Sequence, residues 1–449
     1  MEKLKENTQK LSLLGSVSLG TGVMIGAGIF VLMGQIAELV GDLFPIAFIV
    51  GAVVVGFSSY SYVKFSNAYP SSGGVAKFLT KAYGPGTAAG SFSLLMYISM
   101  VVAESLVAGT FAAYTLRLFP QEYAGYSSIL GVFLIGTAYI INISGNKIIE
   151  TTATFTAIVK VAGIALLAIS GLIVSGLPTI TGNYVTTNSQ SLPEELGFVA
   201  ALALSILAFK GFTTITNQGG DIKNPHKNVG RSIIISIAVC TIIYVILALS
   251  VAGALSIDEI IIAKDYALAA AAKPIFGEWG SILTIFLAII ATVSGVIASV
   301  YSASRMLGML SEMKQVPNLN RIKNLKNPAL IFTVSLAILL TILFDLTRIA
   351  SIGAIFYLIM DIAIHWGLFR YLKKEVKFNP IIPIIAIFMD IVILSAFIYL
   401  KYVNDPFVLI VAGIGIVLVF LFQYIFMKSH TDKDGNIEMK IGDEEMMKM

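Results

Sequence analysis

Residues 20–30 read GTGVMIGAGIF, and this glycine-rich stretch lies inside the first long apolar run of the chain. Gly20, Gly22, Gly26 and Gly28 each cost a helix about 0.5–1 kcal/mol relative to alanine. Three explanations compete: close packing of helices, a dinucleotide-binding loop, or a deliberate interruption of the helix. The rest of the sequence decides between them.

The composition is that of an integral membrane protein. Of the 449 residues, 57% are hydrophobic and 12% are charged, whereas soluble domains carry about 25% charged residues. Apolar runs long enough to cross a hydrocarbon core of about 30 Å recur from end to end and leave no room for a soluble domain. The net charge of +4 comes from cations spread between these runs, so no nucleic-acid partner is expected.

No pattern of an enzyme or a metal site is present. The single cysteine, Cys240, lies in an apolar run, which excludes a disulfide framework and a cysteine zinc site. The three histidines, His226, His365 and His430, are far apart, and no metalloprotease or nucleophile motif accompanies them. We therefore expect no catalytic residues, no metal and no cofactor.

The apolar runs predict an all-α polytopic membrane protein with twelve transmembrane helices. The predicted spans are 12–36, 43–66, 88–117, 126–144, 152–175, 195–218, 230–255, 278–309, 328–345, 348–371, 381–401 and 406–427.

Lysines and arginines set the orientation of these spans. If the N-terminus is cytoplasmic, 23 of them lie in inside segments and five in outside segments, while Lys160 and Lys210 lie within spans. The asymmetry predicts a multi-pass protein of the cell membrane with a cytoplasmic N-terminus (1–11) and a cytoplasmic tail (428–449).

The two longest outside segments differ in character. Segment 176–194 is polar, and Ser191 and Glu194 have the spacing of a capping box before span 6. Segment 256–277 has amphipathic pieces and predicts a short surface helix.

A second glycine interruption lies five spans after the first, in LSILAFKGFTTITNQGGDIKNP (204–225). An odd offset makes the two spans run in opposite directions, as inverted repeats require. Backbone freed from helical pairing offers N–H groups to a carboxylate and carbonyls to an amine, which suits the two ends of a free amino acid. Close packing of Gly22 and Gly26 remains an alternative for span 1, whereas no strand and helix flank the glycines as a dinucleotide site requires.

Three stretches resemble the amino acid-polyamine-organocation permease superfamily, and within it the proton-coupled amino acid permeases. They are VMIGAGIF (23–30), DIKNPHKNVGRSI (221–233) and SASRMLGMLSEMKQVP (302–317). Gly230 stands where the family usually has proline, and Ser232 where it has alanine.

The resemblance implies a fold of five plus five helices in inverted repeats, shared with sodium-coupled leucine-type transporters. The transporter core would span 12–372, with repeats at about 12–175 and 195–372, and two additional helices would occupy 381–427. It also implies alternating access to a substrate site at the membrane midplane.

The same resemblance places the substrate carboxylate on backbone N–H groups, those of Gly26, Ala27 and Gly28. Gly20 and Gly22 would instead allow close approach of neighbouring helices.

The substrate amine would bind the carbonyls of Met24, Leu207 and Lys210. Many relatives have an aromatic gate at the position aligned with Leu207. Its absence leaves Phe209, or a residue elsewhere, as the group that closes over the substrate.

Lys160 lies about 15 Å deep in span 5, near the bilayer centre. Burial of an ionisable group there costs about 2.5–3.5 kcal/mol, which makes it a functional candidate. In proton-coupled relatives a lysine on this span replaces a sodium ion, and Lys160 resembles that residue. Its amine is expected to contact carbonyls from Gly20 to Gly22 and hydroxyls of Thr292 and Ser294, with its proton driving transport. A permanently held structural lysine is the alternative.

Glu104 lies near mid-depth in span 3. It would bind a cationic substrate, take part in a proton relay, or form a structural pair with Lys210.

Asp361 and His365 are one helical turn apart in span 10 and share a face. They would relay protons, since histidine titrates near neutrality, or form hydrogen bonds between helices. Asp390 in span 11 is expected to be structural or interfacial.

These features predict a secondary active transporter for an amino acid or related amine, with a small-molecule substrate, protons and membrane lipid as its partners. Proton coupling through Lys160 competes with sodium coupling, exchange and uniport. A channel is a further alternative, because broken helices also line pores. Leu207 and Phe209 favour an apolar or neutral amino acid, whereas Glu104 leaves room for a cationic amino acid or polyamine.

Overall fold

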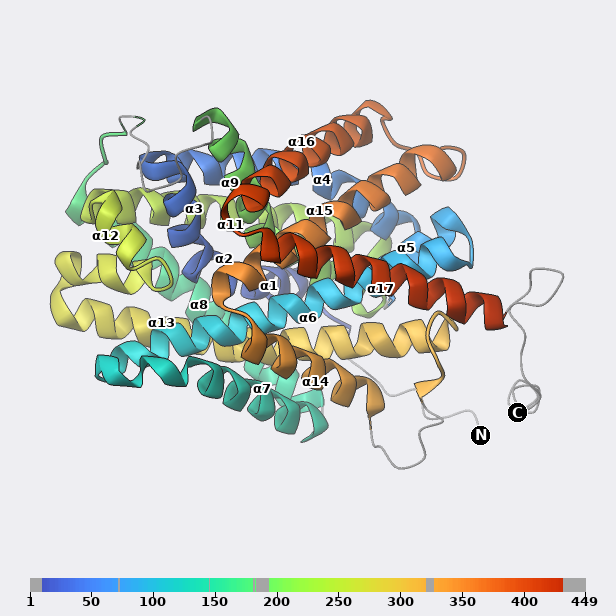
Figure 1. Ribbon diagram of the computed structural model, residues 1–449, viewed down its shortest axis with the longest axis horizontal. Coiled ribbons are helices and arrows are strands. Elements are labelled where there is room, and N and C mark those ends of the chain that lie inside the picture. The colour runs from blue at the N-terminus through green and yellow to red at the C-terminus, as the bar shows by residue number, and fades with distance from the viewer. Residues whose placement is uncertain are drawn as a thin grey trace.

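The computed structural model shows a bundle of long helices (Figure 1). In the described part, the β-type contact is an isolated bridge between Leu11 and Ile222. The residues that the structure describes are 10–71, 73–144, 146–180, 182, 194–319 and 327–430.

The described residues form seventeen α-helices. In chain order they are α1 (Leu13–Met24), α2 (Ala27–Phe30), α3 (Leu32–Val40), α4 (Phe44–Ala68), α5 (Gly74–Tyr83), α6 (Thr87–Thr115), α7 (Ser127–Ser144), α8 (Asn146–Ser175), α9 (Glu194–Phe209), α10 (Phe212–Asn217), α11 (Pro225–Ala254), α12 (Ile257–Ile262), α13 (Ala267–Glu312), α14 (Pro328–Leu343), α15 (Leu346–Tyr371), α16 (Ile381–Asn404) and α17 (Pro406–His430). Short 3-10 helices occupy Gly41–Leu43, Leu116–Leu118, Gln121–Tyr126 and Gly219–Asp221.

The described helices account for the twelve predicted spans. Ten helical stretches are long and apolar enough to cross a membrane, and α9 and α14 are two shorter apolar helices. The first span is divided into α1 and α2 and the sixth into α9 and α10, as the glycine interruptions predict. The expected all-α polytopic architecture is confirmed.

Some details differ from the sequence prediction. The eighth span is the second part of α13, because that helix is interrupted at Gly277. The φ angle of Gly277 is 70°, a conformation that glycine adopts without steric strain. The surface helix expected in 256–277 is present as α12 and the first part of α13. The sequence does not predict α5, because its ten residues form a helix too short for a membrane span. Ser191 of the expected capping box lies outside the described residues, as do residues 1–9 and 431–449 of the termini.

Helix contacts occur in exchanged pairs, as two related repeats require. When helices five spans apart are matched, the contact of α1 with α11 corresponds to that of α9 with α4, and the contact of α6 with α15 corresponds to that of α13 with α8. The contacts of α6 with α14 and of α13 with α7 match in the same way, while α4 and α11 pack against each other directly. This exchange of partners is the pattern that an internal pseudo-two-fold axis produces.

The connecting helices mark the two ends of the bundle. In Figure 1, α5 lies at one end and α12 at the other, and α17 ends on the side of α5. The additional helix α16 packs against α4, α9 and α15, and α17 packs against α6 and α15.

Candidate functional site

The first helix interruption frees backbone carbonyls inside the bundle. Helix α1 ends at Met24, Ile25 leaves helical geometry with φ −80° and ψ 66°, and the Gly26 N–H turns back to the Met24 carbonyl at 2.9 Å. The Gly22 carbonyl accepts a hydrogen bond from the Lys160 ammonium at 2.7 Å. The Met24 carbonyl accepts one from the Tyr244 hydroxyl at 2.6 Å.

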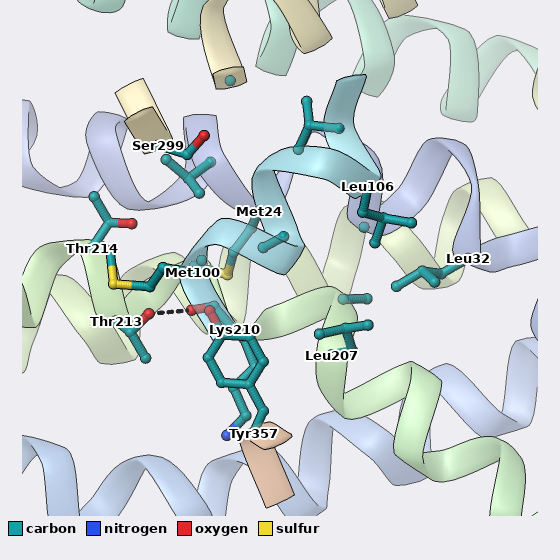
Figure 2. A pocket seen from close by; sticks show the side chains of 17 residues that line it. Met24, Leu32, Met100, Leu106, Leu207, Lys210, Thr213, Thr214, Ser299 and Tyr357 are labelled. Carbon is teal, nitrogen blue, oxygen red and sulfur yellow. Dashed lines mark hydrogen bonds between the residues drawn. The ribbon is translucent and has the colours of Figure 1, made fainter. Parts of the chain in front are cut away.

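The second interruption is a tighter turn. Gly211, between α9 and α10, keeps a right-handed conformation with φ −54° and ψ −19°. The Lys210 N–H donates to the Leu207 carbonyl at 3.1 Å, and the Thr213 hydroxyl donates to the Lys210 carbonyl at 2.8 Å (Figure 2). The Met24 carbonyl therefore already accepts from two internal donors, and so does the Lys210 carbonyl, because the Thr213 N–H also donates to it at 3.0 Å. The Leu207 carbonyl accepts from the Lys210 N–H and keeps a second lone pair.

Glycine lets the two interruptions touch through their backbones. A Cβ atom on Gly28 would lie 2.7 Å from the Ala208 carbonyl oxygen, and one on Gly211 would lie 2.7 Å from the Met24 nitrogen. A Cβ on Gly20 would lie 2.3 Å from a side-chain carbon of Ile215, which agrees with the packing role expected for it. The glycines thus serve packing and interruption together.

A central cavity lies where the interruptions meet (Figure 2). Its volume is about 70 Å³, well below the roughly 300–1,000 Å³ of sites for drug-sized ligands. Apolar side chains from α1, α3, α6 and α9 make most of its wall. Its polar side chains are Lys210, Thr213, Thr214, Ser299 and Tyr357.

Half of the residues expected at the substrate line this cavity. They are Met24, Gly28, Leu207 and Lys210. Gly26 and Ala27 precede the lining residue Gly28 in the turn. Phe209 instead packs on Tyr244, with ring centroids 5.0 Å apart, so Leu207 is the residue of this pair that faces the cavity.

The expected pair between Glu104 and Lys210 is wrong. Lys210 forms its ion pair with Asp361, whose carboxylate also accepts hydrogen bonds from Ser58 at 2.8 Å and Tyr62 at 2.7 Å. All these side chains are buried, so the lysine charge is cancelled beside the cavity. Within the described residues neither carboxyl oxygen of Glu104 has a hydrogen-bond partner.

Lys160 is 3% exposed, and its ammonium donates to the Gly22 carbonyl at the first interruption. This carbonyl is within the Gly20 to Gly22 stretch that the sequence predicts as its partner. Thr292 donates its hydroxyl to the Ala288 carbonyl at 2.7 Å, and Ser294 donates to the Ala291 carbonyl at 3.1 Å. Both hydroxyls therefore serve their own helix α13 in this conformation.

His365 contacts the additional helix α16. Its Nε2 lies 3.3 Å from an Asp390 carboxylate oxygen, and both side chains are fully buried. The interfacial position expected for Asp390 is present, but its partner is decided by packing of α15 on α16.

Several polar residues of the site are not found by sequence reasoning. Tyr244 ties the two interruptions together, because its hydroxyl also lies 3.2 Å from the Ala208 carbonyl. Tyr357 and Ser299 reach the cavity from α15 and α13. Thr213 and Thr214 had a signal in the run of hydroxyls that follows Gly211, whereas a lone tyrosine or serine in an apolar span gives none.

A small internal cavity between two interrupted helices, inside a bundle of membrane-spanning length, fits a membrane transporter. The sequence model of the amino acid permease family matches residues 11–431 of the chain. The chain belongs to the amino acid permease family, and it is a transporter rather than an enzyme.

Three relatives illustrate the similarity. An uncharacterized protein of Methanocaldococcus jannaschii is 30% identical over 94% of this chain and 96% of its own length. The inner membrane transport protein YbaT of Escherichia coli is 27% identical over 87% of this chain and 90% of its own. The serine/threonine exchanger SteT of Bacillus subtilis is 25% identical over 84% and 89%.

Proposed function

We propose that the protein is a secondary active transporter that moves a small neutral amino acid by alternating access. The cavity bounded by both helix interruptions is the observation that carries this proposal. Its small volume favours a small substrate. Its mostly apolar wall, and the pairing of Lys210 with Asp361, favour a substrate whose side chain carries no charge. Serine and alanine are the amino acids of choice for a first test, and the similarity to the serine/threonine exchanger SteT supports serine.

The backbone of the first interruption would bind the substrate carboxylate. The N–H groups of Ala27 and Gly28 open a helical turn, where orphan donors favour an anion. The Gly26 N–H would leave the Met24 carbonyl to join them. The Met24, Leu207 and Lys210 carbonyls would accept the substrate ammonium, which would replace one of the two internal donors at Met24 and at Lys210. The interruptions would separate when the cavity opens, because backbone contacts at Gly28 and Gly211 close it.

The transport cycle would be coupled to protons through Lys160. Its ammonium binds the Gly22 carbonyl, two residues before α1 ends, so it fixes the first interruption from α8. A neutral amine holds a carbonyl less strongly than an ammonium does, and loss of the proton would therefore release α1. Thr292 and Ser294 on α13 would receive the amine when α1 moves away.

The transporter would lie in the cell membrane with both termini in the cytoplasm. The cation distribution supports this orientation, and α5 and α12 mark opposite ends of the bundle. The transporting core would be the repeats 12–175 and 195–372, with α16 and α17 added outside them.

Uptake into proteoliposomes tests the proposal. Labelled L-serine and L-alanine are offered to purified protein under an imposed inward proton gradient, with and without sodium. We expect saturable accumulation that collapses with a protonophore and ignores sodium. Sodium dependence with indifference to the proton gradient contradicts the coupling, and flux without saturation or counterflow indicates a channel.

Two lysine variants separate the role of Lys160 from general stability. Lys160→Ala should abolish gradient-driven accumulation, whereas Lys401→Ala, at a buried lysine near the end of α16, should leave it intact. An exchanger, as SteT is described to be, would instead require amino acid inside the vesicles and ignore the gradient. Accumulation that survives Lys160→Ala removes this residue from the coupling mechanism.

A further inference from the structure

Four buried ionisable side chains meet beside the cavity. They are Lys210 at the second interruption, Asp361 and His365 on α15, and Asp390 on α16, and each is 0–3% exposed. One nitrogen or oxygen from each of Asp361, His365 and Asp390 lies within 4.8 Å of the others. The proposed transport function makes no use of His365 or Asp390.

The charges in this cluster require one further proton. Lys210 cancels Asp361, so Asp390 is neutralised only by one further proton, held either by His365 as an imidazolium or by the Asp390 carboxyl itself. An isolated buried carboxylate is strongly unfavourable. An imidazolium 3.3 Å from Asp390 makes the four groups neutral as a set.

The surrounding helices supply no other cation to this cluster among the described residues. The titratable groups that face it are Tyr62 of α4, Tyr83 of α5 and Tyr357 of α15, and Glu104 of α6 is a neighbour of Tyr357. The hydroxyl of Tyr62 already donates to Asp361, and that of Tyr83 donates to the Ala363 carbonyl. The basic residues of α17, Lys428 and His430, lie in its last turn.

We propose that His365 and Asp390 hold one exchangeable proton, and that this site controls the contact between Lys210 and Asp361 at the wall of the cavity. When the proton is present, the imidazolium competes with Lys210 for Asp361. When it leaves His365 for water, the set carries one negative charge, and the two carboxylates hold Lys210 more firmly. Proton occupancy would thus change how tightly the interruption between α9 and α10 is tied to α15.

The same three donors raise the alternative of a divalent metal. The ammonium of Lys210 on Asp361 disfavours a second cation there, so the geometry favours a proton. Titration with zinc decides between the two.

Nitrogen NMR of histidine tests the proton site without any transport measurement. The chain has three histidines, so the double variant His226→Gln/His430→Gln, labelled with 15N-histidine in lipid nanodiscs, reports His365 alone. We expect both ring nitrogens to show the imidazolium signature at pH 7, and Asp390→Asn to convert it to neutral imidazole. A neutral ring in the unsubstituted cluster, an imidazolium that survives Asp390→Asn, or a zinc-induced change reversed by EDTA overturns the proposal.

Uptake of labelled L-serine between pH 5.5 and 8.5 tests whether the proton site controls the contact between Lys210 and Asp361 at the cavity. This second experiment rests on the proposed function. Asp390→Asn should flatten the pH profile, while the His226→Gln/His430→Gln control keeps it. Asp390→Glu, which retains the carboxylate, should restore the dependence. An unchanged profile overturns the control of Lys210, whereas absence of L-serine uptake by the natural chain contradicts the substrate proposal and leaves the NMR result decisive for the proton site.

Discussion

Substitution of Gly28 by alanine tests whether contact between the two interruptions forms the substrate site. Helix α2 brings Gly28 against the backbone of α9, and the new Cβ would lie 2.7 Å from the Ala208 carbonyl oxygen. Ordinary van der Waals contact begins at 3.4 Å, so the two segments must separate by about 0.7 Å. The neighbouring atoms belong to the Ala208 backbone, which cannot rotate aside as a side chain does.

The geometry sets the size of the effect. Overpacking of a closely fitted site costs about 1–3 kcal/mol. If the closed site carries this cost and the open one does not, binding weakens by about 5- to 150-fold, because 1.4 kcal/mol corresponds to a factor of ten. Gly28→Val adds two more methyl groups and should abolish measurable binding. Membrane insertion should persist in both variants, since alanine and valine are readily accepted by a membrane helix.

Equilibrium binding of labelled L-serine to purified protein measures the effect, and size-exclusion chromatography checks folding. Gly56→Ala is the matched control, because no atom lies within 4 Å of the Cβ it would add to α4. Its affinity should equal that of the natural chain. Unchanged binding in a well-folded Gly28→Ala protein would refute a substrate site at the closure of these interruptions.

Three further predictions concern the groups around the site. Asp361→Asn should lower the free energy of unfolding by about 3–5 kcal/mol, because it leaves Lys210 buried without its counter-charge. The double variant Asp361→Leu/Lys210→Met should recover most of that loss. A double variant as unstable as the single one contradicts the ion pair between Lys210 and Asp361. Tyr244→Phe should cost about 1–3 kcal/mol in thermal unfolding, because the Met24 and Ala208 carbonyls each lose the hydroxyl as a donor. An unchanged melting temperature would contradict a stabilising role for this hydroxyl. The pKa of Glu259 lies below its ordinary value of 4.5 because Ser256 donates hydrogen bonds to its carboxylate. This cap therefore stabilises α12 above pH 4.5, and the stabilisation is lost as the pH falls through the lowered pKa. Hydrogen exchange at the start of α12 should quicken over that fall in pH, and Glu259→Gln should reduce the pH dependence of the exchange.

The general architecture follows from features of single segments. Membrane spans are visible in the sequence because each must present about 20 apolar residues to lipid, whatever its neighbours are. The interruptions are visible because glycine clusters are costly inside a helix, and Lys160 because a cation at that depth is rare. The helix α5 escapes this reasoning, since a short amphipathic helix at the membrane surface needs no long apolar run.

The partners of the buried polar groups do not follow from single segments. Glu104, Asp361, His365 and Asp390 are each recognisable as buried ionisable residues, but the choice of partner for Lys210 depends on which helices meet at its depth. Helix α15 brings Asp361 to Lys210, and α16 brings Asp390 to His365. Phe209 faces Tyr244 rather than the cavity for the same reason, because the rotation of α9 is fixed by its neighbours.

The sequence by itself determined the membrane class, the twelve spans, the two interruptions and the membership of a transporter family. These properties are written in local hydropathy, glycine content and short motifs, which act within one helix. Only the tertiary structure decided which interruption residues line the cavity, that the two interruptions approach through the Gly28 and Gly211 backbones, and that Lys210 is neutralised by Asp361. These contacts join residues up to about three hundred positions apart, and their geometry depends on the rotation and depth of each packed helix, which the pattern of a single span leaves open.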